Sequence, residues 1–240
     1  MQLVFNLWGL LHVLKWGQTY NSFYGFKTAG IFQNVAEVDA YKSASGSVIQ
    51  PDAKPGDFRW VDTNGDGTIT DDDKQYLGSA LPKFSFGLTV NLEYKGFDMM
   101  VTTQGVAGNK IFQGLRRLDI AGANYQTSVL GRWTGEGTSN SYARLTNNDT
   151  NGNFTKASDF YLENGDYLRF KLIQLGYSLP SNLVSKIGAS RLRLYVTGEN
   201  LFTFTKYTGY DPEIGGDIMG IDRGYYPQSR SFIFGANVQF

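Results

Sequence analysis

Residues 62–73 carry oxygen-bearing side chains at the spacing of a calcium-binding loop. In loops of the EF-hand type, Asp or Asn stands at positions 1, 3 and 5 and glycine at 6. Position 7 gives its backbone carbonyl, and an acidic residue stands at 12. At those positions this chain has, in the same order, Asp62, Asn64, Asp66, Gly67, Thr68 and Asp73.

The spacing matters because calcium takes six or more oxygen ligands, and residues two apart around a tight turn converge their carboxylates. Gly67 permits the positive φ that such a turn requires. Ile69, which stands between polar neighbours, is expected to anchor the loop to the rest of the protein. Asp73 is shorter than the usual Glu, so we expect weak binding and a structural role. The alternative is an acidic, solvated surface turn.

Other chemistry is limited by the composition. The chain has one histidine, His12, and no cysteine, which excludes a two-histidine zinc motif and a thiol nucleophile. His12 lies in an apolar run and is expected to pack. Asp211 and Glu213 flank a proline, and an Asp-Pro turn is favoured here over a role in acid–base catalysis. We assign no catalytic residue and do not expect an enzyme.

Charge and residue usage indicate a neutral protein rich in strands. Lys+Arg and Asp+Glu both number 22, and without a basic cluster no nucleic-acid partner is expected. The 29 glycines and the 15% aromatic content favour turns and strands over helices.

The elements around these residues alternate strictly between apolar and polar side chains. From Phe84 to Tyr94 every second residue is apolar and the residues between are small or polar, which suits a strand with one face in an apolar medium. Its length fits the ~9–11 residues of a tilted strand that crosses a bilayer. Similar alternation predicts strands near residues 97–104, 167–172, 191–197 and 231–240, and a weaker one at 22–33.

Connection lengths predict an orientation. Lys95-Gly96 is a tight turn, whereas residues 106–166 and 205–230 form long connections, as in barrels with periplasmic turns and extracellular loops. With the Lys95-Gly96 turn in the periplasm, the count places Phe240 in the periplasm and residues 34–83 outside the cell.

We therefore predict an all-β fold, an antiparallel transmembrane β-barrel segment of about six strands with long extracellular loops. Six strands would leave two open edges in lipid, so they are expected to be the C-terminal part of a larger barrel of about 22 strands. A soluble sandwich also alternates, but strands of this length and the basic residues on the polar face argue against it.

Three segments carry a family resemblance. They are residues 22–33 (SFYGFKTAGIFQ), residues 56–73 followed by Gly78 and Pro82, and residues 198–213 (GENLFTFTKYTGYDPE). Together they resemble SusC/RagA-type TonB-linked (TonB-dependent) outer-membrane receptors. The match spans residues 17–240, and residues 1–16 do not fit, which suggests a displaced start. The aromatic end at Phe240 resembles the signal read by the barrel-assembly machinery.

The resemblance implies import of glycan or peptide nutrients across the outer membrane. It implies a SusD-like lipoprotein partner, contact with outer-membrane lipid, and contact with TonB through an N-terminal part that is absent here together with the plug domain. No substrate-binding residue can be assigned. The alternatives are a calcium-stabilised surface β-domain that binds glycans without transport, and an inactive gene fragment.

Overall fold

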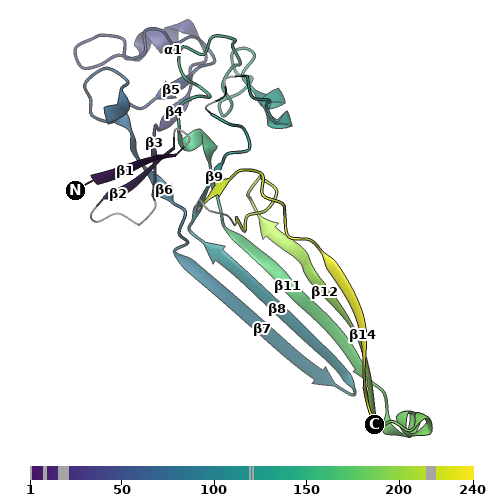
Figure 1. Cartoon of the computed structure of the whole chain (residues 1–240). Helices are drawn as coiled ribbons and strands as arrows, with labels where there is room; N and C mark the ends of the chain where they lie inside the picture. The colour runs from purple at the N-terminus through teal and green to yellow at the C-terminus, as the bar shows by residue number, and fades with distance from the viewer. Residues whose placement is uncertain (1, 8–9, 16–21, 119, 121, 215–219) are drawn as a thin grey trace. The chain divides into compact units, whose positions relative to one another are not determined.

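The computed structural model describes residues 2–7, 10–15, 22–118, 120, 122–214 and 220–240. The chain divides into two compact units (Figure 1). The sheet unit comprises Pro82–Asn109, Asn164–Ile214 and Tyr225–Phe240. The loop unit comprises Met1–Leu81, Lys110–Glu163 and Gly215–Gly224.

The sheet unit is built on one five-stranded antiparallel sheet. In spatial order its strands are β14 (Ser231–Gln239), β12 (Arg191–Thr205), β11 (Tyr167–Ser178), β8 (Phe97–Ala107) and β7 (Phe84–Tyr94). These long strands lie side by side in Figure 1. Between β11 and β12 the chain forms the short helix α2 (Ser181–Val184) and a 3-10 turn (Ser185–Ile187).

A two-residue turn joins β7 to β8, as the sequence predicts. Tyr94 pairs with Phe97, so only Lys95 and Gly96 lie between the strands. Both have positive φ, 47° and 85°, which is the type I′ geometry whose twist matches that of a hairpin.

The register aligns side chains of one kind on each face of the sheet. One row across four strands contains Leu88, Thr103, Phe170 and Phe202. On the same face, further apolar residues follow this row in both directions along the strands. The opposite face contains polar and charged side chains such as Asp98, Gln104 and Arg169. Large side chains on the apolar face are exposed, for example 60% for Leu88 and 80% for Phe234. Exposed apolar surface on this scale indicates contact with a membrane or a partner.

The structure corrects one predicted strand. Residues 22–33 contain two short strands, β3 (Ser22–Gly25) and β4 (Thr28–Ile31), and neither belongs to the five-stranded sheet. At Gly25 the backbone approaches so closely that an added Cβ would lie 2.4 Å from the carbonyl oxygen of Ala157, and Gly30 has φ +98°. These features redirect the chain, and alternation alone does not reveal them.

The loop unit contains small sheets and short helices. Strands β1 (Gln2–Leu7), β2 (Leu10–Lys15), β3 and β6 (Gln75–Ser79) form one sheet, and β4 pairs with β5 (Phe58–Trp60). Strands β10 (Leu162–Asn164), β9 (Lys110–Gln113) and β13 (Ile221–Asp222) form another. Helix α1 spans Val35–Ala40, and 3-10 turns cover Asp71–Asp73, Thr127–Gly131 and Asp159–Tyr161. His12 lies in β2, and the predicted packing of its side chain falls outside the described residues.

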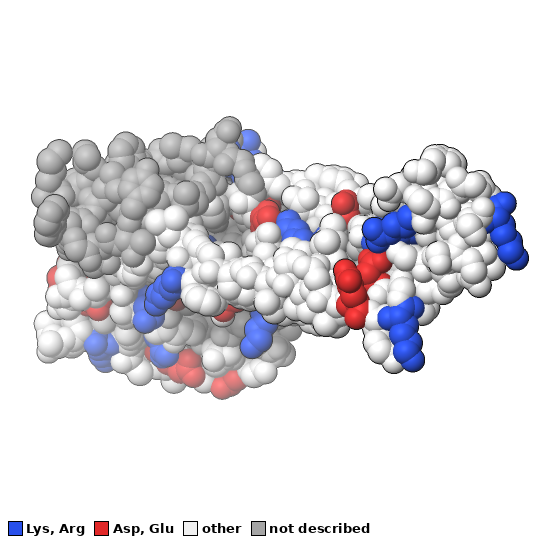
Figure 2. All heavy atoms as spheres, turned by 90° about the horizontal axis from the view of Figure 1, so that it is seen from below, with Lys and Arg blue, Asp and Glu red and all other residues white. Residues whose placement is uncertain are grey.

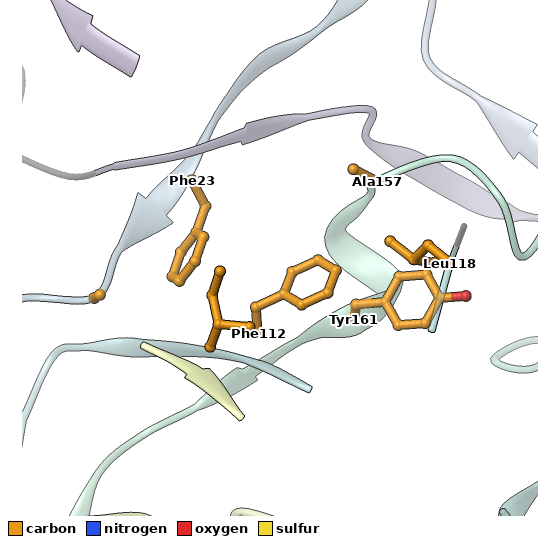
Figure 3. Packing of buried hydrophobic residues seen from close by; sticks show 7 residues of the cluster. Phe23, Phe112, Leu118, Ala157 and Tyr161 are labelled. Carbon is orange, nitrogen blue, oxygen red and sulfur yellow. The ribbon is translucent and has the colours of Figure 1, made fainter. Parts of the chain in front are cut away.

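Aromatic residues form the interior of the loop unit. In Figure 3, Phe112 lies between Phe23 and Tyr161, and its ring centroid is 6.3 Å and 5.3 Å from theirs. A second cluster contains Phe26, Phe58, Trp60 and Phe154. Contacting aromatic rings add stabilisation to that of buried area, so segments with little regular structure still share a packed interior.

On the face drawn in Figure 2, positive and negative side chains are interspersed, in keeping with the zero net charge of the sequence. Among the residues that the structure describes, we find no helix with the length and apolar character needed to cross a bilayer.

Candidate functional site

The loop at residues 62–73 follows β5 closely and has the turn geometry that its sequence predicts. The carboxylate of Asp62 accepts hydrogen bonds from the N–H groups of Gly65 and Gly67, at 2.7 and 2.8 Å. The side-chain oxygen of Asn64 accepts from Asp66 N–H at 3.0 Å. These bonds draw the first three predicted ligand residues around one turn.

Gly67 is required at its position for two reasons. Its φ is +88°, and an added Cβ would lie 2.8 Å from the Cβ of Ser43. Gly65 also has positive φ, +76°, but nothing lies within 4 Å of its added Cβ. Ile69 packs against the second aromatic cluster, which confirms the predicted anchor.

Asp73 lies beneath the loop and is fully buried. One of its oxygens accepts from Thr63 N–H at 2.7 Å and the other from Thr70 N–H at 2.8 Å. A carboxylate has about four acceptor positions, so Asp73 retains capacity for a further partner. Its visible role is to tie the two ends of the loop together.

Hydrogen bonds within the loop favour the ionised form of Asp66. The side-chain amide of Asn64, and then the N–H and hydroxyl of Thr68, lower the pKa of Asp66. The donor set of carboxylates, an amide oxygen and a backbone carbonyl is of the kind that calcium prefers. Within the described residues, however, no three His, Cys, Asp or Glu side chains are grouped closely enough to hold a metal by themselves.

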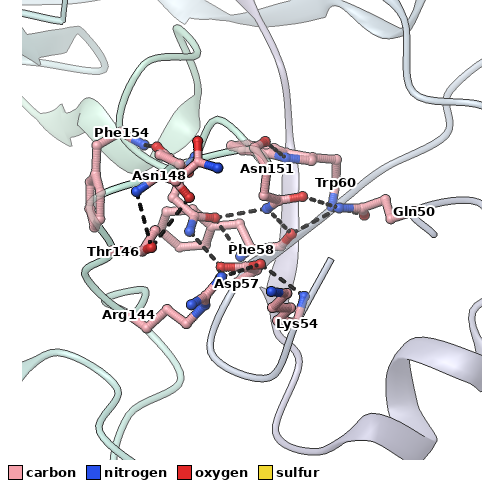
Figure 4. A network of polar contacts seen from close by, with 12 residues as sticks. Gln50, Lys54, Asp57, Phe58, Trp60, Arg144, Thr146, Asn148, Asn151 and Phe154 are labelled. Atoms are coloured by element: carbon pink, nitrogen blue, oxygen red, sulfur yellow. Dashed lines mark hydrogen bonds and ion pairs between the residues drawn. The ribbon is translucent and has the colours of Figure 1, made fainter. Parts of the chain in front are cut away.

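A buried polar network holds the strand that precedes this loop (Figure 4). Asp57 is fully buried, and its two oxygens accept from Arg144 at 2.7 and 3.1 Å. Asn153 donates to it at 2.8 Å. The indole N–H of Trp60 donates to the carbonyl of Asn151. Because a paired buried charge is costly to break, this network fixes residues 57–60 and so the start of the loop.

In the sheet unit, a second charged cluster gathers on the polar face. Arg169 on β11 is 2% exposed, and its guanidinium donates to Asp211, to Glu213 at 2.9 Å and to the Thr203 hydroxyl at 2.9 Å. Lys171 donates to Glu213 at 2.8 Å. Two cations thus neutralise two carboxylates.

These bonds fasten Tyr207–Glu213, which we call the strap, to strand β11. Glu213 also accepts from Gln104 on β8, and Asp211 accepts from Gln228 N–H at 2.9 Å. The sequence correctly favours a turn at Asp211-Pro212-Glu213, but it does not reveal the partners of the two acids. The only sequence signal is complementary charge between Arg169/Lys171 and a segment much later in the chain.

Comparison with known proteins gives a consistent result. No protein-family model matches the sequence. TonB-dependent receptor P3 of Formosa agariphila is 31% identical over 238 residues, which cover 95% of this chain and 23% of that receptor. TonB-dependent receptor SusC of Bacteroides thetaiotaomicron is 29% identical over 197 residues, which cover 80% of this chain and 18% of SusC.

Solved structures of RagAB, a peptide transporter, share the fold. One matches with a TM-score of 0.71 at 24% identity, and another, in an open-open state, with 0.70 at 22%. Both matches cover 100% of this chain and about a quarter of the matched chain, 25% and 24%. The long strands are therefore those of a β-barrel receptor fold.

The relatives are receptors and transporters rather than enzymes, which confirms that expectation. The present chain spans about a quarter of the length of the curated relatives that it matches, 23% for the first of them. The chain belongs to the SusC/RagA-type TonB-dependent receptors.

Proposed function

We propose that this chain supplies part of the barrel wall of an outer-membrane importer of glycan or peptide nutrients. The observation that carries the proposal is the two-faced sheet, with exposed aromatic and aliphatic side chains on one face and bonded charges on the other. Such a wall suits lipid outside and an aqueous lumen inside. The relatives are TonB-dependent receptors, which supports energised import.

The partners follow from the same proposal. A SusD-like lipoprotein would cover the extracellular side, and TonB would energise import through the N-terminal part of the receptor. Phe240, which is 88% exposed after the end of β14, would be read by the barrel-assembly machinery. The turn at Lys95-Gly96 and Phe240 would then face the periplasm.

Deletion of the coding sequence for residues 84–107 tests the import function. Loss of the β7–β8 hairpin should abolish growth on at least one oligosaccharide or oligopeptide supplied as sole nutrient, because the wall no longer closes. Growth on the corresponding monomers serves as the control and should be unchanged. Normal growth of the deletion strain across a panel of glycans and peptides would contradict the proposal.

We also propose that residues 62–73 bind calcium as a structural staple. The support is the turn geometry, the ionised Asp66 and the donor set of Asp62, Asn64, Asp66, Thr68 and Asp73. Asp62→Ala with Asp66→Ala should weaken calcium binding at least about tenfold, since two of the charged ligands are removed. Calcium titration of the detergent-solubilised receptor measures this. Asp72→Ala is the matched control, because Asp72 is exposed on the same loop but lies outside the ligand positions.

Equal calcium affinity in the double variant and the Asp72→Ala control would remove the calcium assignment. The loop would then be an acidic turn held by the hydrogen bonds of Asp62, Asn64 and Asp73.

A further inference from the structure

A recess of about 350 Å³ lies beside the strap in the sheet unit. Its lining includes Asn200, Thr203, Thr205, Tyr210, Gln228 and Arg230. We propose that this recess binds a carboxylate group of the imported solute through Arg230, with Tyr210 against the adjoining part of the solute. The inference rests on the proposed import function and names a chemical feature of the substrate.

The charges around the recess favour an anionic group. Asp211 also lines the recess, but its carboxylate is already bound by Arg169 and by Gln228 N–H. Arg230, in contrast, is exposed, and no carboxylate of the described residues lies within ion-pair distance of it. Within the part of the chain that the structure describes, Arg230 therefore brings to the recess a guanidinium that no carboxylate neutralises.

The guanidinium of Arg230 favours a carboxylate as its ligand. A guanidinium presents N–H groups in a planar fork that matches the two oxygens of a carboxylate. Thr203, Thr205 and Gln228 add hydrogen-bonding groups around it, and a small number of polar groups in a cavity is what fixes ligand orientation. Among the described lining residues, an anion that entered this recess would meet the guanidinium of Arg230 and several uncharged polar groups, while Arg169 and Asp211 are already paired with each other.

Tyr210 gives the site a second contact. Its side chain is 68% exposed although the strap that carries it is fixed by the buried bonds of Arg169. An exposed tyrosine on a fixed backbone segment offers apolar ring surface and a polar tip with little conformational entropy to lose. Arg169 is a positioning residue here, since it holds the strap and its charge is already paired with Asp211 and Glu213.

Peptides and acidic glycans both contain carboxylates, so two probe pairs separate the sources. Pentaalanine with a free C-terminus is compared with its C-terminal amide, and trigalacturonate with its full methyl ester. Calorimetry on the detergent-solubilised receptor should show that one acid binds at least about tenfold more tightly than its neutral form. The pair that shows the difference identifies a peptide or a uronate.

Arg230→Gln should abolish the preference for the acid, and Arg230→Lys should restore part of it, since Lys keeps the charge without the fork. Lys206→Gln removes an exposed cation next to the lining residue Thr205 and should leave the preference unchanged. A preference that persists in Arg230→Gln would overturn the inference. So would an equal loss in Lys206→Gln, or the absence of any preference in both probe pairs. A receptor that imports its nutrient normally despite such a result would keep the proposed function.

Discussion

Leu88→Arg should prevent stable assembly of the sheet in the outer membrane, whereas Thr89→Arg should be tolerated. Leu88 and Thr89 are neighbours at the middle of β7 but point to opposite faces. The apolar face carries Leu88, paired with Thr103, and the polar face carries Thr89, whose hydroxyl lies 3.1 Å from that of Thr102. An arginine at the lipid midplane of a barrel costs about 2–4 kcal/mol, and lumen positions are exempt from that cost.

The two variants are matched in charge, size and position along the strand, so any difference between them reports the environment of each face. The measurement is the free energy of unfolding by denaturant in phospholipid vesicles, together with the amount of receptor in the outer membrane. Equal stability of the two variants would mean that the apolar face does not contact lipid.

Arg169→Met should destabilise the sheet unit by about 3–5 kcal/mol, the cost of removing one partner from a buried ion pair. The substitution would leave Asp211, which is 7% exposed, and Glu213 without their shared guanidinium. The strap should detach, and protease should cleave it faster than in the wild type. The triple variant Arg169→Met, Asp211→Leu, Glu213→Gln is the control, because it leaves no uncompensated charge and should recover most of the loss.

The pH dependence of this effect has a definite sign. Burial raises the pKa of Asp211, but hydrogen bonds from Gln228 N–H and Arg169 outweigh it, so the net pKa is lowered. A lowered pKa stabilises the fold above the ordinary carboxyl range near pH 4, and the contribution is lost as pH falls through the folded-state value. The difference between wild type and Arg169→Met should therefore shrink below about pH 4. A difference that grew toward acid pH would contradict the role of the ion pair.

The sequence predicts the strands best where alternation is unbroken. β7 has the predicted bounds, Phe84–Tyr94. β12 extends to Thr205, well beyond the predicted end at residue 197, because Gly198 and Asn200 interrupt the pattern. Asn200 has φ +53°, and the pairing of β11 with β12 shifts there. An irregularity of this kind ends a periodic pattern without ending the strand.

Those parts of the candidate sites whose contacts join residues close in sequence can be predicted from the sequence. The turn at residues 62–67 follows from the spacing of Asp62, Asn64, Asp66 and Gly67, because its hydrogen bonds join residues two to five apart. The burial of Asp73 and the grouping of Arg169 with the strap depend on chain segments distant in sequence. No local pattern encodes such contacts, so only the folded structure shows them.

Density-gradient fractionation of cells, with an antibody against residues 138–150, tests most directly whether this chain forms a membrane-embedded wall. We expect the chain to be recovered with the outer membrane, to resist alkaline extraction and to enter solution only with detergent. Recovery of the chain folded and soluble without detergent would contradict the claim.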